Sequence, residues 1–176
     1  MTLGAAALVV AGCDSGKPAR SARLQAVVLG WHENCGTRAD PLLIETRRLI
    51  VGERRWWVKL SFRNDTRVTL RVTRPHFLGE RLFGLEPFST TSFREVLRRA
   101  KTAEAGPRAL ADRFAPSKPT LIAPGEGWSG SFSGPGPLPS GTPIRVVLGL
   151  FYITQHVPRG FFGGFICVSR RYVELR

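Results

Sequence analysis

Residues 55–73, RWWVKLSFRNDTRVTLRVT, decide the fold class of this chain. Apolar and polar side chains alternate along both halves of the stretch, which is the period of a β-strand with one buried face. The predicted core faces comprise Trp56, Val58, Leu60 and Phe62 in the first half and Val68, Leu70 and Val72 in the second. Asn64-Asp65 between them is a two-residue turn signal, so we predict a β-hairpin here.

The rest of the chain continues with short strands separated by turns. The 19 Gly and 13 Pro residues supply turn positions throughout the sequence. Such strands, without regularly alternating helices, favour an antiparallel sandwich over a parallel sheet. We therefore predict a mainly β fold of about eight strands. Besides the hairpin, strands are expected at residues 24–30, 46–51, 128–133, 144–153, 165–169 and 172–175.

Residues 91–115 depart from the β pattern. Ser92 and Glu95 form a capping box, and apolar residues follow it at helical spacing until Gly106. Pro107 suits the first turn of a second helix, which we expect to run through Phe114. The sandwich is thus predicted to carry a short two-helix insertion, whose Arg-rich side is either an ordinary solvated face or a surface for anionic lipid headgroups.

The composition is that of a single globular domain with a strong positive charge. The chain has 176 residues, of which 43% are hydrophobic, and a formal net charge of +13. This hydrophobic content excludes a disordered chain. The cations recur as short pairs along the whole sequence, and no nucleic-acid-binding motif organises them. We therefore expect no nucleic-acid partner.

The beginning of the chain has the pattern of an exported, lipid-anchored protein. Residues 3–11 form an apolar run too short to span a bilayer, and residues 14–23 are polar and linker-like. Between them VAGC, residues 10–13, resembles the lipobox of bacterial lipoproteins. The resemblance implies that residues 1–12 are a signal peptide and that Cys13 receives a diacylglyceryl group and palmitate. Residues 13–23 would then tether the domain, residues 24–176, to the cell membrane on its extracytoplasmic side.

Two further cysteines lie near the two ends of this domain. If Cys13 carries lipid, Cys35 and Cys167 remain as a pair in an oxidising compartment, which favours a disulfide. Two free buried thiols are one alternative. The other is a metal site in which His32, Glu33 and Cys35 are the first ligands. The remaining histidines, His76 and His156, are the residues that could complete that site.

A second resemblance concerns the body of the chain. The segments WWVKLSFRNDTRVTLRV (56–72), LIAPGEGWSGSFSG (121–134) and GTPIRVVLGLFYI (141–153) follow one another in the sequence. In this order they resemble the immunoglobulin-like domains found in many secreted bacterial lipoproteins. The resemblance implies an immunoglobulin-like antiparallel β-sandwich with a binding or structural role, although fold alone names no ligand.

Two glycine-rich segments superficially resemble catalytic motifs. GWSGS, residues 127–131, lacks the last glycine of a G-x-S-x-G nucleophile elbow, and RGFFGGF, residues 159–165, lacks the Lys-Ser/Thr of a phosphate loop. We therefore expect no enzymatic activity and no cofactor. The second segment is instead a candidate interaction loop, with Arg159, Phe161 and Phe162 at its tip, unless these phenylalanines close the core.

Together these patterns predict a lipid-anchored extracytoplasmic protein that acts as an interaction or structural module of the cell envelope. The expected partners are the membrane, through the N-terminal lipid, and an envelope protein, an anionic lipid or a cell-wall polymer. One alternative is a solute- or metal-binding lipoprotein that uses the region of His32, Glu33 and Cys35. A third, an envelope hydrolase, has the least support in the sequence.

Overall fold

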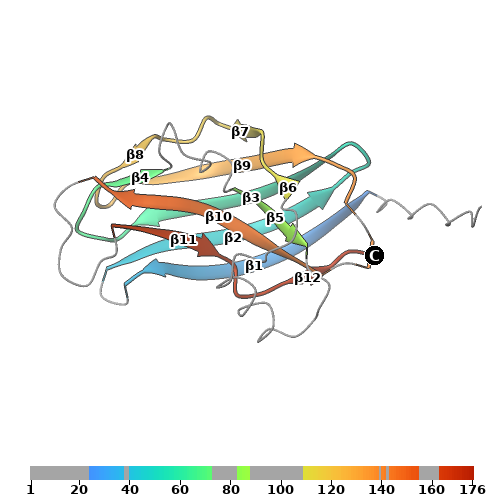
Figure 1. Cartoon of the computed structure of the whole chain (residues 1–176), viewed down its shortest axis with the longest axis horizontal. Coiled ribbons are helices and arrows are strands. Elements are labelled where there is room, and N and C mark those ends of the chain that lie inside the picture. Colours follow the sequence, from blue (N-terminus) through green and yellow to red (C-terminus); the bar gives the residue numbers. More distant parts are fainter. Residues whose placement is uncertain are drawn as a thin grey trace, which may run out of the picture.

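A computed structural model describes residues 24–37, 40–72, 83–87, 109–138, 140–141, 143–154 and 163–176. Within these ranges every regular element is a β-strand, and the strands form two antiparallel sheets packed face to face (Figure 1). The prediction of a mainly β sandwich is therefore confirmed, with twelve strands in the described ranges instead of about eight. The same residues contain no helix with the length and hydrophobicity of a membrane span.

The first sheet has five strands in the order β1-β2-β3-β9-β7. All four neighbouring pairs are antiparallel. In this order β1 forms one edge of the sheet, the short β7 forms the other, and the longer strands lie side by side. Its strands are β1 (Gln25–Gly36), β2 (Pro41–Val51), β3 (Arg55–Asn64), β9 (Gly127–Pro135) and β7 (Arg113–Ala115).

The second sheet is built around one long strand, β10 (Pro143–Ile153). β5 (Phe83–Pro87) and β4 (Leu70–Val72) pair with successive parts of one edge of β10. The opposite edge pairs with β11 (Gly164–Val168) and β12 (Val173–Glu174). Two short strands extend the sheet outward: β6 (Ala109–Leu110) beyond β5, and β8 (Leu121–Ile122) beyond β4.

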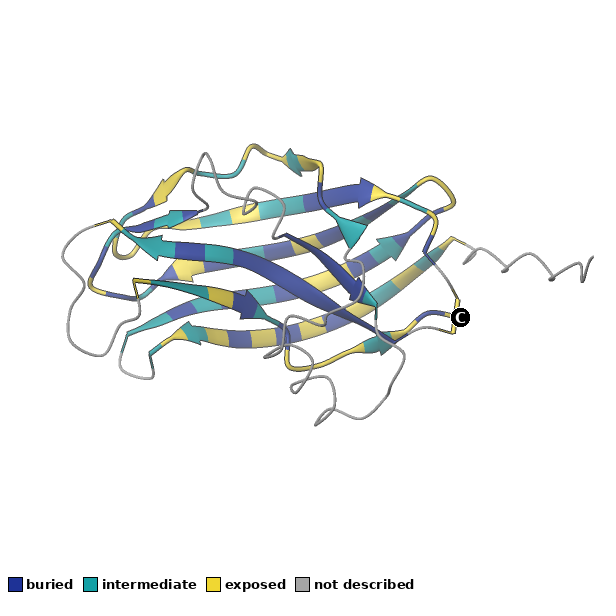
Figure 2. Cartoon of the chain, viewed as in Figure 1, coloured by how far each residue is buried: buried dark blue, intermediate teal, exposed yellow. Residues whose placement is uncertain are grey.

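The core lies between the two sheets, and the side chains that were predicted to be buried within residues 55–73 belong to it. The predicted core faces of both halves are buried, with Trp56 and Leu70 fully so. Figure 2 shows the result as alternating buried and exposed residues along the strands of the first sheet, and as an almost continuous buried run along β10. Phe132 from the first sheet and Phe83 from the second meet edge to face in the centre, with ring centroids 5.5 Å apart.

The predicted hairpin at Asn64-Asp65 is wrong. β3 pairs with β2 and β9, whereas β4 pairs with β10 and β8 in the other sheet. The chain therefore crosses from one sheet to the other after Asn64. The side chain of Asn64 is fully buried at the crossing and donates to the carbonyls of Val68 and Ile122. Alternating hydrophobicity identifies the buried face of each strand but not the strand that pairs with it.

The second helix of the predicted insertion is also wrong. Residues 109–110 and 113–115 form β6 and β7 instead. β6 pairs with β5 and β7 with β9, so neighbouring strands supply the backbone hydrogen bonds that a helix would have made internally. Phe114 packs edge to face on Phe83 at 5.2 Å. The first predicted helix, within residues 91–108, lies outside the described residues.

Candidate functional site

A disulfide joins Cys35 in β1 to Cys167 in β11, with their Cα atoms 5.7 Å apart in space and the two residues 132 positions apart in the sequence. The predicted bridge is thus present. β1 is the edge strand of the first sheet and β11 belongs to the second, so the bridge links the two layers of the sandwich. Because both sulfurs are bonded to each other, neither is a thiolate ligand for a metal.

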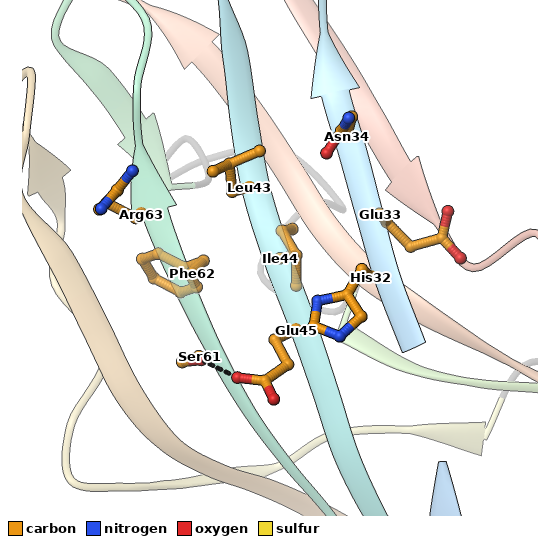
Figure 3. Close-up of a pocket in the computed structure, with 9 residues that line it drawn as sticks. All are labelled: His32, Glu33, Asn34, Leu43, Ile44, Glu45, Ser61, Phe62 and Arg63. Atoms are coloured by element: carbon orange, nitrogen blue, oxygen red, sulfur yellow. Dashed lines mark hydrogen bonds between the residues drawn. The ribbon is translucent and has the colours of Figure 1, made fainter. Parts of the chain in front are cut away.

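The three candidate metal ligands do not point to one place. His32 is exposed on the outer face of the first sheet, whereas the neighbouring Glu33 is buried on the other side of the strand. The Glu33 carboxylate accepts a 2.9 Å hydrogen bond from the backbone N–H of Arg170, and Figure 3 shows it pointing away from the imidazole. Within the described ranges, no three His, Cys, Asp or Glu side chains are grouped so that they could hold a metal ion.

Several residues singled out in the sequence lie outside the described residues. They are Cys13, His76, His156, Arg159, Phe161 and Phe162. The candidate site is therefore built from the sandwich itself.

The outer face of the first sheet carries a concentration of polar and cationic side chains, which we call the polar face. Counting by twos along β3 places Trp57, Lys59, Ser61 and Arg63 there, as the alternation predicts, opposite the buried core face. Trp57 is half-buried. β9 adds Ser129 and Ser131, which lie beside Ser61 and Lys59 in the register of the sheet. The remaining members are His32, Asn34, Glu45, Arg47, Arg48, Arg55 and Arg113.

A shallow hollow of about 260 Å³ lies over β1, β2 and β3 on this face (Figure 3). Glu45, on the middle strand β2, lies between His32 and Ser61 at one end of the hollow. Its carboxylate accepts hydrogen bonds from the Ser61 hydroxyl at 3.3 Å and from Arg47 Nε at 3.0 Å. The Arg47 hydrogen bond is the largest cause that holds the pKa of the Glu45 carboxyl below its ordinary value. The lining comprises His32, Glu33, Asn34, Leu43, Ile44, Glu45, Ser61, Phe62 and Arg63.

Two further hollows lie beside the first. One, of about 260 Å³, lies over β3 and β9. It contains no carboxylate, and its lining comprises Arg47, Lys59, Leu60, Ala115, Ser129, Gly130 and Ser131. The other, of about 490 Å³, wraps around the free edge of β1 and includes Arg170 and Arg171. It shares His32, Glu33 and Asn34 with the first hollow. The three hollows therefore follow one another across the sheet.

The cations of the polar face fall into two groups. Arg47, Arg55 and Arg63 have carboxylate partners in Glu45, Asp112 and Asp65 respectively. Within the part of the chain that the structure describes, Arg48, Lys59 and Arg113 have no acidic partner, and neither do Arg170 and Arg171 at the β1 edge. The described part of the face therefore carries an uncompensated positive charge.

Comparison with known proteins adds no relative: no protein-family model, no curated protein and no solved structure matches the chain. The polar face and the covalent link between the sheets are thus the features of the described residues that bear on function.

Proposed function

We propose that this protein is a lipid-anchored extracytoplasmic module of the cell envelope, held at the membrane through Cys13 and exposing its sandwich to a partner. The observation that carries the proposal is the disulfide between Cys35 and Cys167. Structural disulfides persist in extracytoplasmic, oxidising compartments and are rare in the cytosol. The bridge thus agrees with the export that the VAGC segment at residues 10–13 implies.

The finer fold assignment, an immunoglobulin-like domain, belongs to the same proposal. Its support is the packing of two antiparallel sheets, the second of which is built around the long strand β10. The turn at residues 124–126 gives further support, because Glu126 closes it by accepting the Ala123 N–H at 2.8 Å and Gly125 adopts a positive φ of 81°. Domains of this architecture commonly serve recognition. An open polar face suits contact with a large partner, whereas small molecules usually bind in enclosed, mostly apolar cavities.

The anchor is tested by metabolic labelling with an alkyne analogue of palmitate in a bacterium that processes lipoproteins. We expect the full chain to incorporate label and Cys13→Ala to lose it. The matched control is the double variant Cys35→Ala/Cys167→Ala, which should keep the label because its lipobox is intact. Label that persists at the wild-type level in Cys13→Ala would refute the anchor.

The compartment is tested separately by alkylating the protein directly on cell lysis, before any air oxidation. We expect Cys35 and Cys167 to react with the alkylating reagent only after reduction. Mass spectrometry of the tryptic peptides identifies the state of each cysteine. Alkylation of both cysteines without reductant would place the protein in a reducing compartment and overturn the proposal.

A further inference from the structure

We propose that the polar face binds a linear anionic polymer of the cell envelope, which runs across the strands from the β1 edge towards β7. The inference rests on the proposed function, because it names the partner of that envelope module. Four observations on the described residues support it, and each concerns a different property: charge, hydrogen-bonding capacity, extent and apolar exposure.

The first observation is a pair of cations that face each other without an acidic neighbour. Arg48 of β2 and Lys59 of β3 are direct cross-strand partners, and both are exposed. Like charges at directly opposite positions of an antiparallel pair repel each other and weaken the sheet locally. An anionic group placed between the guanidinium and the ammonium removes this repulsion, so the pair is a preformed point of attachment for a negative charge.

The second observation is a set of hydroxyl groups beside these cations. Lys59 is paired with Ser131 of β9, and Ser129 lies two residues away on the same face. Together with Arg47 they line the hollow that has no carboxylate. The Ser131 hydroxyl donates to the Ala115 carbonyl at 3.4 Å. The Lys59 ammonium, the Arg47 guanidinium and the Ser129 hydroxyl are therefore the donors in this depression that match the oxygen acceptors of phosphate or carboxylate groups.

The third observation is the extent of the cationic surface. The cations without acidic partners lie at both ends as well as in the middle: Arg170 and Arg171 by the β1 edge, and Arg113 on β7. β1 and β7 are the two edges of a five-stranded sheet. Four spacings of about 4.8 Å separate them, a span of roughly 19 Å. Several charges spread over that span suit a chain of repeating anions better than one small ion.

The fourth observation separates a polymer from a bilayer surface. Proteins that dock on membranes through one face usually insert large apolar side chains between the headgroups. Five large apolar side chains are exposed in the described residues, and only Val28 of them lies on the polar face. The others, Leu24, Leu121, Ile166 and Tyr172, lie outside the polar face as defined above. Trp57, Ile50 and Leu43 on the same face are half-buried. Val28 is thus the one exposed large apolar side chain on the described part of the face, which offers mainly charge and hydrogen bonds.

The test measures binding of the full chain carrying Cys13→Ala, so that no acyl group contributes, after mass spectrometry has confirmed the Cys35–Cys167 bridge. The probe is long-chain inorganic polyphosphate, titrated at low ionic strength and followed by calorimetry. We expect saturable binding whose affinity falls steeply as salt is added. Arg48→Gln/Lys59→Gln should weaken it about tenfold or more and lower its salt dependence.

The matched control is Arg54→Gln/Arg176→Gln, which removes the same net charge from two exposed arginines outside the polar face. We expect the control to weaken binding less than about threefold. Equal losses in both double variants would overturn the proposal, because net charge alone would then account for binding. Urea unfolding curves that coincide for the two variants establish that both are folded.

A second arm uses vesicles of phosphatidylglycerol and phosphatidylcholine in place of polyphosphate. Binding to these vesicles as tight as to the polymer, and lost in Arg48→Gln/Lys59→Gln, would overturn the polymer in favour of a membrane surface. Polymer binding without vesicle binding supports the proposal. Neither result depends on palmitate labelling. If the chain does not bind the polymer, the proposed lipid anchor is unaffected, and if Cys13 carries no lipid, the proposed polymer binding is unaffected.

Discussion

The side-chain amide of Asn64 donates a 2.9 Å hydrogen bond to the backbone carbonyl of Ile122, which lies 58 positions later in the sequence. The same amide donates to the Val68 carbonyl at 2.9 Å, and its oxygen accepts from the N–H and hydroxyl of Thr66. Asn64 ends β3 in the first sheet, whereas Ile122 belongs to β8 in the second. One buried side chain therefore connects the two sheets where the chain crosses between them.

Asn64→Ala should lower the free energy of unfolding by about 2 to 4 kcal/mol, because it leaves two buried carbonyls and the Thr66 N–H without this partner. Urea denaturation followed by tryptophan fluorescence measures the change at constant m-value. The matched control is Asn34→Ala on the exposed face of β1, which should stay within about 0.5 kcal/mol of wild type. Equal effects of the two substitutions would contradict the bridging role of Asn64.

The ion pair between Arg145 of β10 and Glu86 of β5 is almost completely buried, with exposures of 5% and 2%. The residues are direct cross-strand partners, and Arg145 Nε donates to Glu86 Oε2 at 2.6 Å. Glu86→Gln should cost about 3 to 5 kcal/mol, because it leaves a buried guanidinium without its counter-charge.

Replacing both partners tests whether this loss comes from an uncompensated charge. Arg145→Met/Glu86→Leu should recover most of the stability lost in Glu86→Gln, since it removes both charges at once. Thermal unfolding of the three proteins gives the comparison. A double variant less stable than the single one would mean that the pair itself, and not its imbalance, stabilises the second sheet.

The Cys35–Cys167 bridge should be a major source of stability. A covalent loop closed across 132 positions restricts the unfolded chain, and the loop-entropy model assigns such a loop about 4 to 5 kcal/mol. We expect Cys35→Ser/Cys167→Ser to lose that amount in urea denaturation. Adding reductant should destabilise the wild-type protein to the same level and leave the double variant unchanged. A reductant effect on the double variant would assign the loss to another cause.

The pH dependence of polymer binding follows from Glu45. Arg47 lowers the pKa of the Glu45 carboxyl, so Glu45 stays ionised until the pH falls below the ordinary range of a glutamate. The ion pair stabilises the fold above the unfolded-state pKa, and this contribution is lost as the pH falls through the lowered folded-state pKa. Protonation also frees Arg47 for an anionic ligand, so polyphosphate affinity should rise through that same pH range.

Glu45→Gln should reproduce this gain at pH 7, with an affinity about two- to fivefold above that of the unsubstituted chain. The additional rise in acid should shrink to the part that comes from other carboxylates, such as Asp65 beside Arg63. The control is Glu53→Gln in the exposed turn between β2 and β3, which removes one negative charge away from the hollow. Calorimetric titrations at several pH values compare the variants. An equal gain in the control would mean that only net charge responds.

The sequence predicted the class of the fold and its core well, because both depend on local alternation. Trp56, Val58, Leu60 and Phe62 fall on one face whatever strands surround them. The pairing of the strands could not be predicted in the same way, because it depends on contacts between residues distant in the sequence. Asn64 is an example. Its residue type fits a hairpin turn and equally fits a buried hydrogen-bond network, and the position of the Ile122 carbonyl, 58 residues away, determines that it forms the network.

The candidate site was predictable to a similar degree. The alternation along residues 56–63 puts Trp57, Lys59, Ser61 and Arg63 on the face opposite the core, and they lie there. Their proximity to Ser129 and Ser131 could not be anticipated, because it arises from the pairing of β3 with β9. The segment 109–115 was misassigned for a related reason. Apolar spacing after Pro107 fits a helix locally, but β5 and β9 pair with this segment and stabilise it as two strands.

The disulfide also determines how the domain responds to mechanical force. Cys35 lies near the end of the first strand and Cys167 in the last but one, so nearly all the sandwich is enclosed in one covalent loop. Tension applied between Gln25 and Arg176 first loads the hydrogen bonds that hold β1 to β2 and β12 to β10. Once these break, the tension passes through the S–S bond and bypasses the chain between Cys35 and Cys167. Only β1 and the short tail after β11 can be pulled out, and the strands between the two cysteines carry no tension until the bridge is reduced.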